Sequence, residues 1–148
     1  MPTTIDLYRE LKAVTPDSLQ YLLHDLFAEN TFWELQTEKA TSKRIEIGKW
    51  EVTLEMDARK VTVDSMGNEN VIPMDDWIEV GIYGSKEIVG SPVKQLYLQK
   101  SRIVSGKTIL KVVFPEEPRN AGIDPNHLLI DLDLENNTRK IEYASGSQ

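Results

Sequence analysis

The spacing of apolar residues changes once along the chain, near residue 31. In residues 1–30, apolar positions recur at the spacing of an amphipathic helix. Two groups have this spacing: Ile5, Leu7, Tyr8 and Leu11, and then Leu19, Leu22, Leu23, Leu26 and Phe27. Thr15-Pro16-Asp17 lies between them and offers an N-cap, a proline at the first helical position and an early carboxylate. We therefore predict a helical hairpin over residues 1–30.

Beyond residue 31 the apolar positions alternate with polar ones, which is typical of strands with one buried face. The clearest case is 50–59, where Trp50, Val52 and Leu54 alternate with charged residues and threonine. Seven segments are predicted to be strands: 33–45, 50–59, 77–83, 95–104, 108–114, 128–134 and 139–143. Turn-forming residues separate them. The pattern predicts a mainly β fold, with the helical hairpin followed by a seven-stranded antiparallel immunoglobulin-like β-sandwich over 31–143 and a disordered tail over 144–148.

Composition narrows the classes of partner. The 148 residues carry a formal net charge of −7, and the sequence pI is near 4.9. An acidic chain lacks the basic face that usually binds nucleic acid, so we expect no nucleic-acid partner. No apolar run approaches the roughly 18 residues that span a bilayer, and the first residues do not resemble a signal peptide. We therefore expect the chain itself to be soluble, without direct membrane insertion.

One acidic stretch has the spacing of a calcium-binding loop. Asp131, Asp133, Glu135 and Glu142 occupy the first, third, fifth and twelfth positions of such a loop. However, Asn136 stands where the loop requires glycine, and leucine or isoleucine residues alternate with the acids. We favour a strand over 128–134 with its apolar residues inward and the acids outward. A calcium site remains the alternative.

Catalytic motifs are absent from the sequence. His24 and His127 are the only histidines, and neither belongs to an HExxH zinc motif. We interpret His24 as a helix-surface residue and His127 as a loop residue. The sequence also lacks a GxSxG nucleophile elbow, a glycine-rich phosphate loop and cysteine. We therefore expect no catalytic, cofactor-binding or metal-binding residue, and no enzyme activity of this chain alone.

Two sets of residues are candidates for an interface. Asp75, Asp76 and Trp77 could form a rim for a ligand or partner, although the simpler interpretation places both acids in a turn and Trp77 at the start of a core strand. In the helical hairpin, the apolar stripe that contains Leu19, Leu23 and Phe27 should either pack on the sandwich or lie partly exposed.

Several segments taken together resemble a known family. They are DLYR (6–9), LKAVTPDSLQYLLHDLF (11–27), PMDDW (73–77), RIVSGK (102–107) and AGIDPNHLLID (121–131). In this order they are similar to the C-terminal region of bacterial membrane proteins that fuse an ABC-transporter-type permease to an aminopeptidase-N-like zinc metallopeptidase domain. None of these segments is a catalytic signature, so the resemblance depends on their combination.

The resemblance implies a context for the chain. Residues 1–30 would be the end of the peptidase's helical part, and the sandwich would be a non-catalytic accessory domain that supports the peptidase, shapes access to its cleft or binds a protein or peptide. Zinc would be bound only in the parent's peptidase domain, which would be the main partner of this domain. The parent would be membrane-associated, with this domain on the extracytoplasmic side, and the natural chain would extend upstream of Met1.

Three other interpretations remain open at the level of sequence. The chain could be a free-standing immunoglobulin-like adhesion or carbohydrate-binding module that displays Trp50 or Trp77. It could be a calcium-stabilised domain. It could also be an enzyme with an unfamiliar site, although no residue constellation indicates one.

Overall fold

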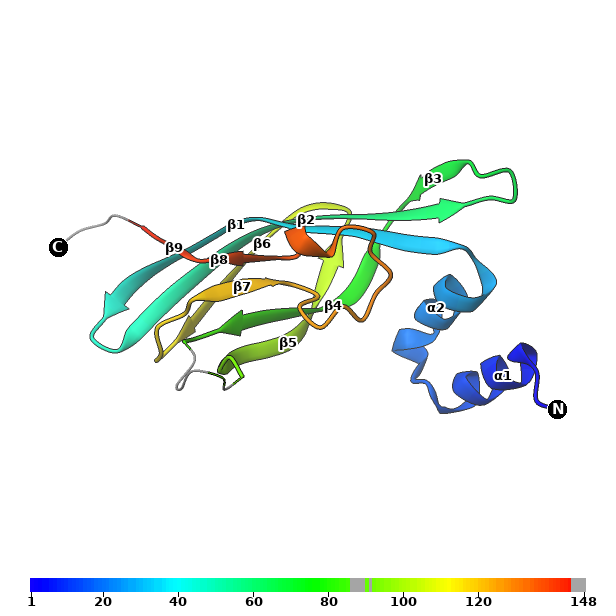
Figure 1. Ribbon diagram of the computed structural model, residues 1–148, viewed down its shortest axis with the longest axis horizontal. Helices are drawn as coiled ribbons and strands as arrows, with labels where there is room; N and C mark the ends of the chain where they lie inside the picture. Colours follow the sequence, from blue (N-terminus) through cyan, green and yellow to red (C-terminus); the bar gives the residue numbers. More distant parts are fainter. Residues whose placement is uncertain (86–89, 91, 145–148) are drawn as a thin grey trace.

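The computed structural model, which describes residues 1–85, 90 and 92–144, has a helical segment at one end of a two-layered β-sandwich (Figure 1). The helical elements are α1 (Thr4–Val14), η1 (Asp17–Leu19), α2 (Gln20–Leu23), the π-helical turn η2 (His24–Ala28) and η3 (Leu134–Asn136). The strands are β1 (Thr31–Glu46), β2 (Lys49–Val63), β3 (Glu69–Ile72), β4 (Asp75–Tyr83), β5 (Gln95–Val104), β6 (Gly106–Phe114), β7 (Asn120–Ile123), β8 (Thr138–Lys140) and β9 (Glu142–Tyr143). The predicted mainly β class is confirmed.

The helical segment begins at a capping box. The Thr3 hydroxyl accepts a hydrogen bond from the Asp6 backbone N–H at 3.2 Å, and the Asp6 carboxylate accepts one from the Thr3 N–H at 2.8 Å. The N-cap predicted at Thr15 is wrong, because Thr15 ends α1 and its hydroxyl donates to the Leu11 carbonyl at 2.6 Å. Pro16 then precedes η1, and its φ of −55° lies within the range that the proline ring allows.

The first sheet is built around the long hairpin of β1 and β2. On its other edge β2 pairs with β6 along its first half and with β3 along its last residues. β9 pairs with β1 in parallel, so this sheet is not entirely antiparallel as predicted. The second sheet has the order β5-β4-β7-β8. The two sheets form the layers of the sandwich, with α1 and α2 at the end where β1 begins (Figure 1).

The core lies between the sheets and is formed by alternate residues of the central strands. From β1 and β2 it receives Trp33, Leu35, Val52, Leu54 and Met56, and from β4 it receives Ile78, Val80 and Ile82. Each of these side chains is at most 2% exposed. Burying such a side chain contributes about 1.5–3 kcal/mol, so this alternation determines which face of each strand points inward.

Two details of the predicted sandwich need correction. The described residues form nine strands and not seven: β3 and β7 are short strands that were not predicted, and the predicted strand over 139–143 is divided into β8 and β9. The strand predicted over 128–134 is wrong, since this segment is a loop that makes only an isolated bridge between Asp131 and Trp33. Of the tail predicted over 144–148, residues 145–148 lie outside the described residues.

Among the residues that the structure describes, no helix has the length and apolar content needed to cross a bilayer.

Candidate functional site

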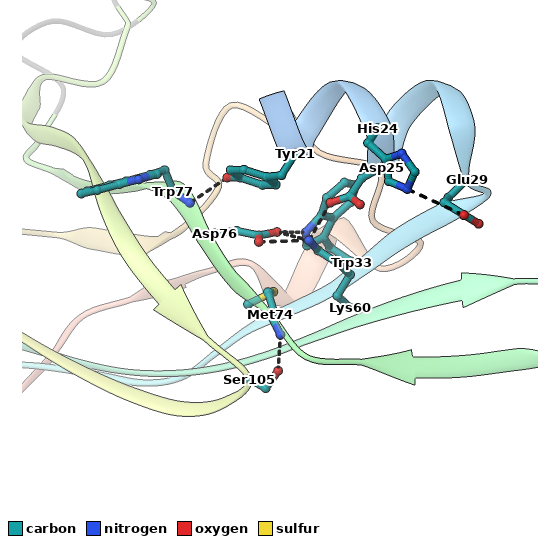
Figure 2. Close-up of polar contacts among 10 residues, drawn as sticks. All are labelled: Tyr21, His24, Asp25, Glu29, Trp33, Lys60, Met74, Asp76, Trp77 and Ser105. Carbon is teal, nitrogen blue, oxygen red and sulfur yellow. Dashed lines mark hydrogen bonds and ion pairs between the residues drawn. The ribbon is translucent and has the colours of Figure 1, made fainter. Parts of the chain in front are cut away.

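A charged residue occupies the inward-facing row of β2. Val52, Leu54, Met56 and Ala58 point into the core, and the same alternation continues to Lys60, which is 4% exposed. A buried ammonium group is costly unless carboxylates and hydrogen bonds compensate it. Lys60 lies at the end of the sandwich where the helical segment packs, and its neighbours there provide this compensation (Figure 2).

Two carboxylates from different parts of the chain bind the Lys60 ammonium. Nζ of Lys60 lies 2.6 Å from Oδ2 of Asp25 in η2, and 2.7 Å from Oδ2 of Asp76 in β4. Asp25 and Asp76 are themselves buried, at 8% and 4% exposure. The ion cluster therefore joins the helical segment, the first sheet through β2 and the second sheet through β4.

Aromatic side chains enclose the same ammonium group. The rings of Tyr21 and Trp33 have their centroids 5.2 Å and 5.5 Å from Nζ of Lys60, within the range of a cation–π interaction. The Trp33 indole N–H donates to Oδ2 of Asp76 at 2.9 Å, and the Tyr21 hydroxyl accepts from the Trp77 backbone N–H at 2.9 Å. We call Tyr21, Asp25, Trp33, Lys60 and Asp76 the Lys60 cluster; all five appear in Figure 2.

The electrostatics of the Lys60 cluster favour a protonated lysine. Burial opposes the charged form, but the hydrogen bonds to Asp25 and Asp76 outweigh it, and the pKa of Lys60 lies above its ordinary value. Burial also raises the pKa of Tyr21. Lysines that act as nucleophiles or bases need a lowered pKa, because the neutral amine is the reactive form. The arrangement is therefore suited to holding three elements together rather than to covalent catalysis.

The six residues proposed from the sequence as an interface lie in two different environments. Asp76 and Leu23 are buried within the chain, and Leu19 is half-buried. Asp75, Trp77 and Phe27 are exposed. The simpler interpretation of Asp75 and Asp76 as turn residues is wrong, because both belong to β4.

The interpretation of Trp77 as the first residue of a core strand is also wrong. Trp77 does not begin the core row of β4, because it points to the outer face and is 41% exposed, whereas its neighbour Ile78 is buried. The Arg102 guanidinium lies 5.8 Å from the Trp77 ring centroid and forms an ion pair with Asp75. One side of the indole is thus occupied by a cation that the chain itself holds in place.

In the acidic stretch that resembled a calcium loop, Asp131 and the alternating apolar residues are oriented opposite to the prediction. Leu128, Ile130, Leu132 and Leu134 are between 41% and 79% exposed. Asp131 instead faces the chain, where its Oδ2 accepts from the Leu35 backbone N–H at 3.1 Å and burial raises its pKa. The predicted orientation is therefore wrong for Asp131 and for these four apolar residues, whereas Asp133 is exposed as predicted.

The loop is fixed at both ends by buried polar groups. The Asp124 carboxylate, at 1% exposure, accepts from the backbone N–H groups of Leu128 and Leu129 at 3.0 Å and 3.1 Å. At the other end the Asn137 carbonyl accepts from the Thr37 hydroxyl at 2.6 Å, and Asn137 is fully buried. These bonds hold the exposed leucines in place without burying them.

The histidines lie apart from these acids. His24 is exposed on η2, with Nε2 at 3.7 Å from a Glu29 carboxylate oxygen, and His127 is an exposed loop residue with a positive φ of 53°. Within residues 1–85, 90 and 92–144, no group of three histidine, aspartate or glutamate side chains is placed to bind a metal ion.

Sequence reasoning missed most of the Lys60 cluster, although a signal was present. Lys60 and Asp76 each occupy the next alternate position of an otherwise apolar row, so they could have been recognised as buried charges. Asp25 and Tyr21 carry no comparable signal, because their role depends on how the helical segment packs against the sandwich.

Comparison with protein-family models, curated proteins and solved structures finds no match for this chain. Since a sandwich architecture by itself does not assign a function, the functional argument depends on the residues described above.

Proposed function

We propose that the chain is a non-catalytic, immunoglobulin-like accessory domain of a membrane-anchored protein that combines an aminopeptidase-N-like metallopeptidase with a permease. In this proposal, residues 1–30 form the end of the peptidase's helical part, and the sandwich supports the peptidase or binds a partner at its surface. The five segments that resemble this family, DLYR to AGIDPNHLLID, are the basis for the parent architecture.

The observation that carries the proposal is the way in which the helical segment is attached. The Lys60 cluster fixes η2 to both sheets through buried charges, which gives the two parts one defined relative orientation. By contrast, α1 has no buried residue, and Ile5, Leu7 and Val14 are more than half exposed. A helix fixed at one end of a sandwich with its apolar side chains uncovered is suited to contact a further folded part.

A support role also agrees with the chemistry of the cluster. The raised pKa of Lys60, caused by its two carboxylate partners despite burial, keeps the amine protonated at neutral pH. The proposal therefore assigns no catalytic or cofactor-binding residue to this domain, and zinc belongs to the parent's peptidase domain. The domain would lie on the extracytoplasmic side of the membrane, together with that peptidase.

One observation favours a second candidate, the free-standing carbohydrate-binding or adhesion module. Trp77 is 41% exposed on the outer face of β4, and exposed tryptophan rings are suited to stacking on sugars. However, Arg102 lies over this ring, and Trp50 packs edge-on against Tyr143 with ring centroids 5.8 Å apart. Neither ring is presented as an open platform, so the accessory domain is the better-supported function.

Reading the coding sequence upstream of the Met1 codon tests the proposal directly. We expect an open frame that encodes hydrophobic spans and an HExxH motif with a downstream glutamate. An in-frame stop codon immediately upstream would refute the parent architecture. A separate assay tests the non-catalytic role. The purified chain should not hydrolyse aminoacyl-anilide substrates with or without added zinc, and metal-dependent hydrolysis would contradict this role.

A further inference from the structure

A groove crosses the outer face of the first sheet, on the side opposite the core. Its floor is formed by Glu34 of β1 and by Asp57 and Arg59 of β2, and its volume is about 630 Å³. Glu34 pairs with Arg59 in the strand register, two residues along from the Gln36–Asp57 pair, so their side chains share one face. The inward neighbours Leu35 and Ala58 are buried, which identifies the groove face as the outer one.

The two ends of the groove are apolar and uncovered. Val71 of β3 lines one end and is 59% exposed, and Leu132 lines the other and is 79% exposed. Leu132 belongs to the loop that Asp124 and Asn137 hold in place, so its position is set before any partner arrives. A pre-organised apolar side chain avoids part of the entropic cost of binding.

Carboxylates dominate the charge of the groove. Glu34, Asp57 and Asp133 all line it, whereas the cation on its floor, Arg59, is already paired with Glu34 through an Nε–Oε2 hydrogen bond of 2.6 Å. Lys107 lies opposite Asp57 in the register, but its ammonium group is 3.0 Å from a Glu38 carboxylate oxygen. The groove therefore retains an excess of negative charge between its two apolar ends.

We propose that this groove binds a cationic peptide segment of another protein, in which lysine or arginine residues are flanked by apolar ones. The carboxylates attract the basic side chains, and Val71 and Leu132 cover the flanking apolar residues. A small polyamine would satisfy the charges alone and would leave both apolar ends uncovered. The inference concerns the outer face of the sandwich and does not depend on the attachment of the helical segment or on the parent architecture.

Fluorescence anisotropy with labelled synthetic peptides tests this inference on the full chain. The probe is Leu-Arg-Leu-Lys-Leu-Arg-Leu, and its control has glutamate at the three basic positions. We expect only the basic peptide to bind, with affinity that falls as salt is raised. Leu132→Ser, and separately Asp57→Asn combined with Asp133→Asn, should each weaken binding about tenfold.

Matched variants on the same outer face control for non-specific effects. Glu51→Gln and Ile109→Ser change an acid and an exposed apolar residue that do not line the groove, and both should bind the basic peptide like the wild-type chain. The inference is overturned if the basic peptide does not bind, if the acidic peptide binds equally well, or if the control variants weaken binding as much as the groove variants. Binding that Leu132→Ser leaves unchanged and spermine displaces would identify a simple cation site and would also overturn it.

Discussion

The ammonium group of Lys60 lies 2.6 Å from Oδ2 of Asp25, which bonds the central strand of one sheet directly to the helical segment. Asp76 holds the same ammonium group from the second sheet at 2.7 Å. One buried cation thus joins the helical segment to both sheets. Substitution of Asp25 removes the contact to the helical segment, and substitution of Asp76 removes the contact to the second sheet. Mutagenesis can therefore test the two attachments separately.

Replacement of Lys60 by methionine should destabilise the chain strongly. The variant would leave the carboxylates of Asp25 and Asp76 buried without their cation, at a cost of about 3–5 kcal/mol in the free energy of unfolding. Chemical denaturation monitored by circular dichroism measures this change. Lys111→Met, at an exposed position of β6, is the matched control and should change the stability by less than about 0.5 kcal/mol.

A neutral version of the cluster should recover much of this loss. Asp25→Asn and Asp76→Asn combined with Lys60→Met remove all three charges and keep an amide oxygen that can accept from the Trp33 indole N–H. Well-packed hydrophobic replacements of buried ion clusters are often neutral or stabilising, and the triple variant likewise leaves no buried charge without its partner. A triple variant as unstable as Lys60→Met alone would show that the charges are not the origin of the effect.

Stability should decline at alkaline pH. The pKa of Lys60 is raised above 10.5 in the folded chain, because its hydrogen bonds to carboxylates outweigh burial. The folded state therefore holds this proton more tightly than the unfolded state, and the resulting stability is complete below pH 10.5 and is lost as the pH rises through the folded-state pKa. Burial raises the pKa of Tyr21 above 10.0, which acts in the same direction.

Urea denaturation at a series of pH values from about 9 to 11.5 measures this dependence. Other lysines and tyrosines titrate in both proteins, so the free energy of unfolding should fall across this range for both. It should fall more steeply for the wild-type chain than for Lys60→Met, because only the wild-type chain loses the Lys60 proton. Parallel curves for the two proteins would exclude Lys60 as a source of the alkaline sensitivity.

Gly122 should not tolerate a side chain. A Cβ at this position would lie 2.1 Å from the Asn137 carbonyl oxygen and 2.5 Å from the Thr138 Cα, both of which are backbone atoms. Gly122→Ala should therefore separate β7 from β8 and cost about 3 kcal/mol or more. Gly84→Ala is the control, since its Cβ would approach only Leu96 side-chain atoms at 3.4 Å or beyond. Thermal denaturation measures the melting temperatures. An equal decrease in the melting temperature of both variants would contradict this prediction.

The stability of the chain should depend on the buried Asp124 carboxylate that anchors the loop, and not on the exposed leucines of that loop. Asp124→Ala leaves the N–H groups of Leu128 and Leu129 without their acceptor, at a cost of about 1–3 kcal/mol. Leu132→Ser should change the stability by less than about 0.5 kcal/mol, because that side chain is 79% exposed. Equal destabilisation by both variants, measured by chemical denaturation, would show that Leu132 is part of the core.

The sequence pattern predicts the central strands β2 and β4 well because their inward rows are buried and mostly apolar. The predicted segment 95–104 coincides with β5, and 50–59 lies within β2. The same alternation extends to Lys60 and Asp76, which marks both as charges at core positions. Their partner Asp25 could not be predicted, because it reaches Lys60 only through the packing of η2 on the sandwich.

The segment 128–134 shows why alternation can mislead. Its apolar residues alternate with acids as in a half-buried strand, yet Asp131 faces the chain while Leu128, Ile130 and Leu132 are exposed. The anchoring groups, Asp124 and Asn137, lie outside the alternating run and act through backbone hydrogen bonds. Periodicity records which residues share a face, but it does not record which face is covered.

Hydrogen exchange of Asp25→Ala tests the central claim, that the Lys60 cluster fastens the helical segment to the sandwich. This variant removes the helical contact and leaves Lys60 paired with Asp76. We predict that amides of residues 20–28 exchange at least about tenfold faster than in the wild-type chain, while amides of β1 and β2 keep their protection. Glu29→Ala, which removes an exposed carboxylate of the same region, should leave both regions unchanged. Unaltered exchange over residues 20–28 in Asp25→Ala, or equal acceleration throughout both sheets, would contradict the claim.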